Sequence, residues 1–520
     1  MSINDLSFIL FLLASVIVYY LIPRTHRWIV LLLASAVFYL SSCSITAVYL
    51  VLTVVITYAF SLWLDRMASY RPDGATREER QEQKKQNIRQ KRAVLGAALL
   101  LDFSSLIVLK YAGFFSSMAN AVFHANLLIP SFLLPLGISF YVFQTAGYLI
   151  DIYRGKYHAQ RSLARYALFV CYFPQMIQGP INRYNAMETQ LYVGNDFDWS
   201  NIQSGFYRIL FGVLKKALIA DPLAPIVAEI YSGYGSYPGF ISFFGAALYC
   251  LQLYCDFSAG MDIVCGASRL FGIRMKENFC QPYFATSLAD FWRRWHISLG
   301  EWMKDYLFFP LALSKYTSKL SKLARKFLPS EIAKRVVPCF ATFVVFLAVG
   351  MWQGPGMANI AYGLWNGLWM SLAVLWAPLG NKLDGHFSYR KNKRLMTVTG
   401  ILRTNLLMII GRYFSNAASL RSALGMLKHT LLAPGFSQLR PALIADLGFS
   451  PMLILQLCVA VSVLFVISVA KEKEINVVQW IFKQKWYVQF LILFIGLLLV
   501  TFCVYGNSNY TPIAYVYENV

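Results

Sequence analysis

The stretch NFCQPYFATSLADFWRRWHISLGEWMKDYLFFPL, residues 278–311, is the densest polar cluster in an otherwise apolar sequence. If its centre is helical, three-and-four spacing predicts one face that packs and another that is free to bind an anion. Arg293 and Arg294 fall on the second face, and guanidinium groups suit bidentate phosphate binding. The packing face carries Trp292, Trp295, His296 and Leu299.

Two interpretations of this cluster stay open at this point. A helix lying in the membrane interface would place its Trp rings at headgroup depth and its Arg side chains on lipid phosphate. His296 is harder to explain in that way, because an imidazole near lipid costs free energy unless it has a partner. It is also the side chain best matched to moving a proton at neutral pH, so we predict His296 as a general base.

The composition predicts a membrane protein. Of 520 residues, 58% are hydrophobic and only 14% are charged, which exceeds what a soluble domain buries. Apolar stretches of the length needed to cross a hydrocarbon core, roughly 20 residues each, recur from end to end. We expect an all-α polytopic protein of about 11–13 transmembrane helices, with re-entrant and interfacial helices around a central funnel.

The charge distribution predicts an orientation in the membrane. The net charge is +22, but the basic residues gather in short loops between apolar segments, which argues against a nucleic-acid partner. The loop at residues 65–92 carries nine Lys or Arg against five Asp or Glu, and no Lys or Arg occurs between Lys110 and Arg154. We expect a multi-pass protein of the bacterial cytoplasmic membrane with the first loop in the cytoplasm and the N-terminus outside.

Other charged residues lie inside apolar sequence. Asp256 and Asp262 are six positions apart, and each is expected either to play a structural role or to orient His296. Lys215 and Lys216 are expected to snorkel at the end of a span, with a basic site for donor phosphates as the alternative. The nine cysteines form no CxxC pair, so the sequence predicts no metal site.

Four segments in order along the chain resemble one known family. They are PLGISFYVFQTAGYLIDIYRGKY (135–157), FPQMIQGPINRY (173–184), LQLYCDFSAGMDI (251–263) and the opening stretch. These segments resemble the signature motifs of membrane-bound O-acyltransferases, nearest the bacterial AlgI/DltB-like branch that acylates cell-envelope polysaccharide or teichoic acid.

The resemblance implies an organisation and an activity. Residues 1–130 would form N-terminal transmembrane helices, residues 131–380 the catalytic core and residues 381–520 C-terminal transmembrane helices. The implied reaction moves an acyl group, acetyl or D-alanyl, from a cytoplasmic thioester to a hydroxyl on an extracytoplasmic polymer or partner. The implied donor is acetyl-CoA or an acylated carrier protein, with no tightly bound cofactor, and the implied partner is an SGNH/DltD-like extracytoplasmic protein.

The chain departs from the family at a central position. The family places its catalytic histidine in a GLWHG-type motif, and Gln353 occupies that position in Gly350-Met351-Trp352-Gln353-Gly354. A carboxamide orients a hydroxyl or a carbonyl but cannot take a proton as a general base. Three readings follow: His296 is the base and Gln353 positions the acceptor, the protein is a catalytically impaired scaffold, or the glutamine is an engineered substitution that captures an inactive state.

The candidate site therefore has a catalytic and a binding part. The catalytic candidates are His296, Gln353 and Asn366, the last of which lies in the following GLWNG segment. A transporter or channel is the competing class, since intramembrane charges also line substrate paths. The sequence shows no two halves of matching hydropathy, which many transporters have. The candidates for donor or substrate binding are Arg293, Arg294, Asp256, Asp262, Trp292 and Trp295.

Overall fold

The structure, a computed structural model, describes residues 6–43, 45–73, 76–130, 132–176, 178–383, 392–505 and 513–516. Over these residues all regular structure is helical, and the β-pairing consists of one isolated bridge between Phe279 and Trp295. The expected all-α class is therefore confirmed. The sequence also predicts a basic loop at residues 382–394, and most of it lies outside the described residues.

The chain divides into two compact units. Unit 1 comprises Met1–Ile209, Ile263–Lys276 and Tyr517–Val520, and unit 2 comprises Leu210–Asp262 and Glu277–Val516. Two of the dividing points, 209/210 and 262/263, fall within single helices, α9 (Trp199–Lys215) and α11 (Gly239–Leu270).

Unit 1 is built around a buried central helix. In α5 (Ile138–Tyr153), 14 of the 16 residues are buried, and both α3 and α4 pack against it. A helix that is apolar on all sides belongs in the interior of a helical assembly. The other elements of unit 1 are α1 (Leu6–Leu21), η1 (Arg24–His26), α2 (Arg27–Ser42), α3 (Ala47–Ala68), α4 (Arg77–Phe123), α6 (Leu163–Cys171), α7 (Phe173–Met176) and α8 (Tyr184–Tyr192), with the first part of α9 and the last part of α11.

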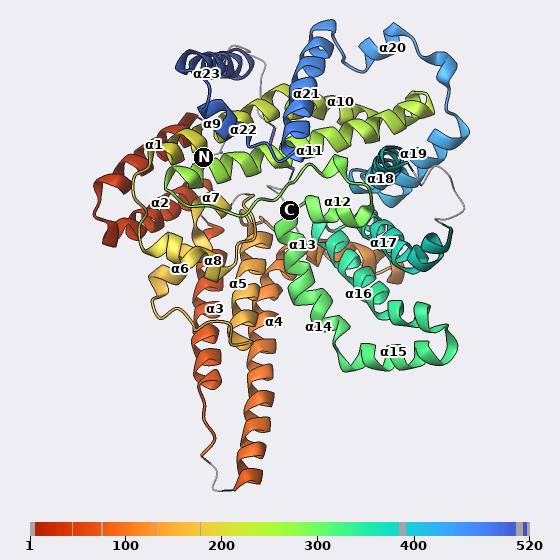
Figure 1. Cartoon of the computed structure of the whole chain (residues 1–520). Helices are drawn as coiled ribbons and strands as arrows, with labels where there is room; N and C mark the ends of the chain where they lie inside the picture. The colour runs from red at the N-terminus through yellow and green to blue at the C-terminus, as the bar shows by residue number, and fades with distance from the viewer. Residues whose placement is uncertain are drawn as a thin grey trace. The chain divides into compact units, whose positions relative to one another are not determined.

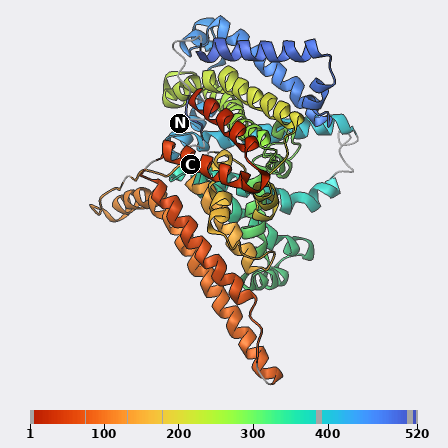
Figure 2. The same cartoon turned by 90° about the vertical axis from the view of Figure 1, so that its left-hand side faces the viewer.

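Helices α3 and α4 lie side by side and extend together beyond the rest of unit 1 (Figures 1 and 2). α4 has 47 residues and is about 70 Å long at 1.5 Å per residue. Its start is fixed by a capping box, in which Thr76 Oγ1 accepts from the Glu79 N–H at 3.2 Å and Glu79 Oε2 accepts from the Thr76 N–H at 3.1 Å. Because the hydrocarbon core is about 30 Å thick, the charged first half of α4 extends outside it.

Unit 2 holds the polar motifs. Its helices α16 and α17 form a close pair, shown side by side in Figure 1. Its elements, besides its parts of α9 and α11, are η2 (Lys216–Ala220), α10 (Asp221–Ser232), η3 (Tyr234–Ser236), η4 (Pro282–Phe284), α12 (Leu288–Arg294), α13 (Ile297–Met303), η5 (Lys304–Phe308), α14 (Phe309–Ala312), α15 (Lys315–Phe327), α16 (Ser330–Gln353), α17 (Met357–Leu383), α18 (Lys393–Ser415), α19 (Leu420–Leu432), η7 (Phe436–Gln438), α20 (Pro441–Asp446), α21 (Pro451–Glu472), α22 (Val477–Phe482), α23 (Trp486–Val500) and η8 (Thr501–Tyr505).

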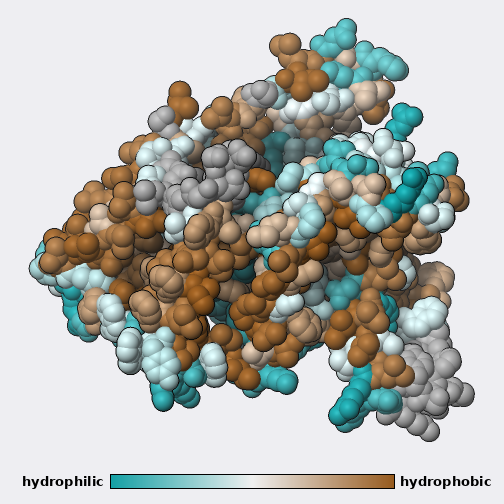
Figure 3. Space-filling view, turned by 90° about the horizontal axis from the view of Figure 1, so that it is seen from above, coloured by the Kyte–Doolittle hydropathy of each residue, from teal (hydrophilic) through white to brown (hydrophobic). Residues whose placement is uncertain are grey.

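Apolar side chains cover much of the surface, as the broad hydrophobic areas of Figure 3 show. Among the described residues, seven helices are long and apolar enough to cross a membrane. This confirms a polytopic membrane protein; three further apolar helices, α1, α2 and α5, have 16 residues each and fall below that length. The seven are Ala47–Ala68, Arg77–Phe123, Gly239–Leu270, Ser330–Gln353, Met357–Ala377, Pro451–Glu472 and Trp486–Val504.

Candidate active site

His296 lies in a turn between two short helices. α12 ends at Arg294 and α13 begins at Ile297, and His296 has left-handed backbone angles, φ 48° and ψ 53°. The condition for a single packing face, one continuous helix through residues 292–299, is therefore not met. Left-handed residues other than glycine are uncommon, and strained backbone of this kind clusters at functional sites.

Asn278 explains why the helix breaks at this point. Its main-chain carbonyl accepts from the Ile297 N–H at 3.1 Å, and its side-chain Oδ1 accepts from the Ser298 N–H at 2.9 Å. The buried Asn278 side chain also donates from Nδ2 to the sulfur of Met261 at 3.2 Å. Asn278 thus takes the N–H groups that would otherwise continue α12 into α13, and it holds the turn from the side of α11.

The same segment fixes the residues on the other side of His296. The Cys280 N–H donates to the Arg294 carbonyl at 3.0 Å, next to the bridge between Phe279 and Trp295. The backbone is therefore held both before and after the histidine. Helix periodicity in the sequence does not predict this break, because the hydrogen bonds come from an extended segment 15 or more positions earlier in the chain.

The imidazole of His296 is buried among aromatic rings. Its ring centroid lies 4.9 Å from that of Phe257 on α11 and 5.5 Å from that of Trp352 on α16. Trp352 directly precedes Gln353, so the fold brings the RRWHIS motif to the end of the helix that carries the family's catalytic position. Burial lowers the pKa of His296 to about 3, so its ring is neutral at physiological pH.

Gln353 and Asn366 belong to the tightly packed α16–α17 pair. Gly350 and Gly363 allow this approach: a Cβ built on Gly350 would lie 2.8 Å from the Gly363 Cα. Gln353 is the last residue of α16. Asn366 is buried in α17 and donates from Nδ2 to the Tyr362 carbonyl at 2.8 Å. Their catalytic roles stay predictions.

The two arginines of the motif differ in their surroundings. Arg294 is held by Asp290 at 3.1 Å and by Glu472 of α21 at 2.7 Å. The Arg293 side chain is 76% exposed and lies 3.3 Å from Asp290. Of the two, Arg293 is the one accessible to an incoming anion, while Arg294 joins α12 to α21. Their role in donor binding stays a prediction.

The two tryptophans of the motif pack against aromatic neighbours. Trp292 contacts Phe346 of α16, with ring centroids 5.0 Å apart, and Trp295 stacks on Phe291 at 5.6 Å. Trp295 is almost fully buried. These contacts hold α12 in place and support a packing role for both rings, whereas their role in substrate binding stays a prediction.

Asp256 and Asp262 pair with two adjacent lysines. Asp262 lies 2.7 Å from Lys215, and Asp256 lies 2.9 Å from Lys216, whose ammonium also contacts Asp221 at 2.9 Å. α11 is continuous through both aspartates, which therefore lie on different faces and meet different partners. The expectation that the lysines snorkel is wrong, because both side chains are buried and bound to carboxylates.

Sequence analysis did not identify Arg412 of α18. It is buried, donates from one terminal nitrogen to the Tyr362 hydroxyl at 3.2 Å and lies 5.4 Å from the centroid of the Trp295 ring. No carboxylate pairs with it among the described residues. The available signal was an arginine directly after the apolar run at residues 406–411, since a charged side chain in such a position is uncommon and expensive in a membrane. Through Trp295, Arg412 helps to hold the turn that carries His296.

Comparison with known proteins identifies the family of this fold. Residues 156–329, which include His296, match the model of MBOAT, the membrane-bound O-acyltransferase family. A probable alginate O-acetylase AlgI of Azotobacter vinelandii is 32% identical over 366 residues, 68% of this chain and 64% of that protein. The peptidoglycan O-acetyltransferase of Helicobacter pylori is 29% identical over 364 residues, 65% of this chain and 64% of that protein.

A teichoic acid D-alanyltransferase of Bacillus subtilis is 26% identical over 294 residues, 54% of this chain and 67% of that protein. The chain spans between 45% and 64% of the length of the alginate O-acetylase relatives. These matches agree with the four sequence motifs and with the all-helical membrane fold. The chain therefore carries a domain of the membrane-bound O-acyltransferase family, and the relatives it matches are those of the AlgI/DltB-like branch.

Proposed function

We propose that the chain is an O-acyltransferase that moves an acetyl or D-alanyl group from a cytoplasmic thioester donor to a hydroxyl on an extracytoplasmic polymer or partner. The observation that carries this proposal is the strained turn at His296, which hydrogen bonds to Asn278 hold in place. The turn packs the imidazole against Trp352, the residue before Gln353. Backbone strain held by this many contacts is typical of an active site. The relatives' names supply the reaction class.

The proposed chemistry needs one base and one hydrogen-bond donor. His296 accepts the proton of the acceptor hydroxyl as its oxygen attacks the thioester carbonyl carbon. The amide of Gln353 donates to the carbonyl oxygen, where negative charge develops in the tetrahedral intermediate. The carbon–sulfur bond then breaks, the thiolate leaves, and His296 returns the proton to the sulfur. Asn366 supports the α16–α17 end of the site.

The proposed setting follows from the charge pattern. The basic loop at residues 65–92 favours a cytoplasmic position, which would place the N-terminus outside a bacterial cytoplasmic membrane. The donor would be acetyl-CoA or an acylated carrier protein on the cytoplasmic side, with no cofactor held permanently. An SGNH/DltD-like protein on the opposite side is the proposed partner that receives or passes on the acyl group.

Two other functions remain as alternatives. Gln353 at the family's histidine position favours a catalytically impaired scaffold that recruits an acylation partner, or an engineered inactive form. The buried charges of Lys215, Lys216, Asp256 and Asp262 favour a transporter. However, these charges pair with one another inside unit 2, as charges with a structural role do.

Thiol release from acetyl-CoA, and from a D-alanylated carrier protein, by the purified protein in liposomes that also contain a hydroxyl-bearing polymer as acceptor separates these functions. We expect activity from the native chain and its loss in His296→Asn, because asparagine tolerates left-handed backbone but cannot act as a base. A silent native chain that gains activity as Gln353→His would indicate an inactivating substitution. A chain silent in both forms would indicate a scaffold, and solute uptake without thiol release would indicate a transporter.

A further inference from the structure

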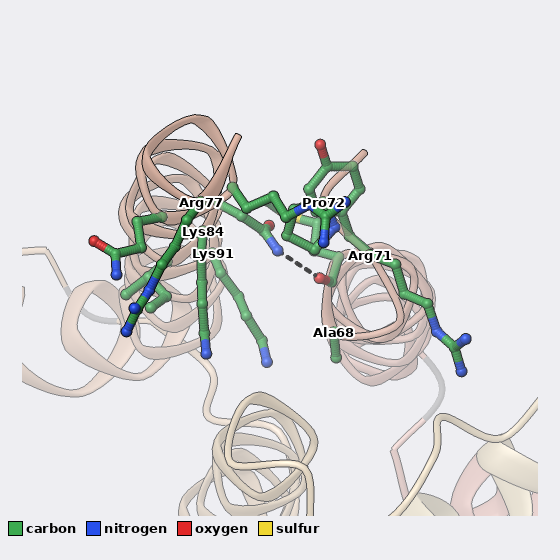
Figure 4. Close-up of a pocket in the computed structure, with 12 residues that line it drawn as sticks. Ala68, Arg71, Pro72, Arg77, Lys84 and Lys91 are labelled. Carbon is green, nitrogen blue, oxygen red and sulfur yellow. Dashed lines mark hydrogen bonds between the residues drawn. The ribbon is translucent and has the colours of Figure 1, made fainter. Parts of the chain in front are cut away.

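A second candidate site lies in unit 1, in the extension formed by α3 and α4. A cleft of about 710 Å³ opens between the end of α3 and the first half of α4. The Asn87 side chain donates to the Met67 carbonyl at 3.0 Å and ties the two walls together (Figure 4). A volume of this size falls within the range of small-molecule sites.

The α4 wall of the cleft is positively charged. Arg77, Arg80, Lys84 and Lys91 line it, and no Asp or Glu is among the lining residues. At 100° per residue these four cations fall within a stripe of about 60° on the helix. The side chains of Lys84 and Lys91 extend in the same direction in Figure 4, whereas Arg71 points away from α4.

The acidic residues of the same segment lie on the opposite face of α4. Glu78, Glu79 and Glu82 fall about 100–200° from Arg77 around the helix axis. Glu79 is engaged in the capping box, and Glu82 pairs with Lys85 at 3.4 Å. The cleft face of α4 therefore carries cations alone, whereas the opposite face mixes acidic residues with cations such as Lys85.

Two features of this cation column are unfavourable unless an anion is present. Arg77 and Arg80 lie in the first turn of α4, where the helix dipole repels cations. Arg80 and Lys84 are a like-charged pair at the four-residue spacing, which is also unfavourable. Among the described residues, Arg77 and Lys84 form no ion pair with a carboxylate. A bound polyanion would offset these repulsions.

The opposite wall has a different chemistry. Met67, Tyr70 and Pro72 line it, and Tyr70 is half-exposed. An exposed aromatic ring suits stacking against a planar base, and a column of Arg and Lys suits phosphate. We propose that this cleft binds a soluble nucleotide through its phosphates on α4 and its base on the Tyr70 wall. This site is distinct from the acyl-transfer site and independent of its chemistry.

The length of α4 favours a soluble ligand over a lipid headgroup. The apolar run of α4 begins at Ala93, so Lys84, Arg80 and Arg77 lie about 13–23 Å beyond it along the membrane normal, even at a tilt of about 20°. The headgroup layer adds only about 5–8 Å on each side of the hydrocarbon core. Most of the cation column therefore extends past the lipid phosphates.

Fluorescence anisotropy with N-methylanthraniloyl-ADP tests this site on the full chain in nanodiscs of zwitterionic lipid. We expect saturable binding that the Arg80→Gln/Lys84→Gln variant weakens about tenfold or more, since it removes two charge-assisted contacts. The matched control, Lys85→Gln/Arg89→Gln, removes the same charge from the opposite face of α4. It should change affinity by no more than about twofold, because only screened long-range attraction is lost.

A second variant tests the apolar wall. Tyr70→Ala should weaken binding of the ADP probe and leave competition by inorganic pyrophosphate unchanged. Equal weakening by the two charge variants would overturn the site in favour of unspecific attraction. The absence of saturable binding of the ADP probe would also overturn the site. So would a cleft variant whose probe binding is lost only in nanodiscs that contain phosphatidylglycerol, because that result is expected of a site for lipid headgroups.

Discussion

Replacing Asn278 by alanine tests whether the turn around His296 positions the imidazole for chemistry. The change removes the acceptor of the Ser298 N–H, 2.9 Å away, and leaves that buried donor without its partner. An unsatisfied buried donor costs about 1–3 kcal/mol. In the native protein the left-handed backbone of His296 is itself strained by about 1–3 kcal/mol. It keeps this conformation only while the surrounding contacts hold it.

We therefore expect Asn278→Ala to lower the free energy of unfolding by about 1–3 kcal/mol. The turn should relax toward helix and move the imidazole, and a displacement near 1 Å can reduce a rate by about 10²-fold. We expect kcat to fall by about 10–100-fold while the KM for the thioester stays within about twofold, because donor contacts are unchanged.

The assay pairs thermal unfolding with thiol-release kinetics in the same lipid. Met261→Leu is the matched control: it removes the weaker sulfur contact of Asn278, 3.2 Å away, but keeps the hydrogen bond to Ser298. This volume-conserving change should cost under about 1.5 kcal/mol and leave kcat near that of the native chain. If Asn278→Ala lost stability but kept its kcat, the turn would be a structural element and not a positioning device.

Three further predictions concern stability and pH. Lys216→Met leaves Asp256 buried without its partner, 2.9 Å away, and should lower the free energy of unfolding by about 3–5 kcal/mol; adding Asp256→Asn should recover part of that loss in the same thermal unfolding assay. Gly350→Ala should separate α16 from α17 and reduce the yield of folded protein, because the added Cβ would lie 2.6 Å from the Asn359 carbonyl oxygen. The control Gly96→Ala should be tolerated, because the added Cβ would meet open space. Burial lowers the pKa of His296 to about 3, below its usual value, so the neutral base is fully present from pH 5.5 to 7.5. We therefore expect a pH profile of kcat without a rise centred near pH 6.5. Such a rise would contradict the buried imidazole.

Sequence alone predicted the fold class well because composition and charge act on the whole chain. An apolar excess forces helices in lipid, and lipid leaves the backbone few other choices. The count of spans was less accessible, since apolar helices of 16 residues, such as α2 and α5, do not differ in pattern from spans. Whether such a helix faces lipid or protein depends on the neighbouring helices that cover it.

The candidate site was predicted in its residues but not in its geometry. His296 was identifiable because it lies in the densest polar cluster of an otherwise apolar chain, where an imidazole near lipid needs a partner. The break at its position was not, because it depends on hydrogen bonds from Asn278, which no periodicity reports. The pairing of Lys215 with Asp262 and of Lys216 with Asp256 was also hidden, since these two aspartates come from a separate helix, α11.

The most direct test of the central claim is the acyl content of the cell-envelope polymer in cells that express the native chain or His296→Asn in place of the resident gene. The account predicts acylation with the native chain and its loss with the variant at equal membrane levels of folded protein, since asparagine keeps the turn and removes the base. Unchanged acylation with His296→Asn would contradict the assignment of His296 as the base.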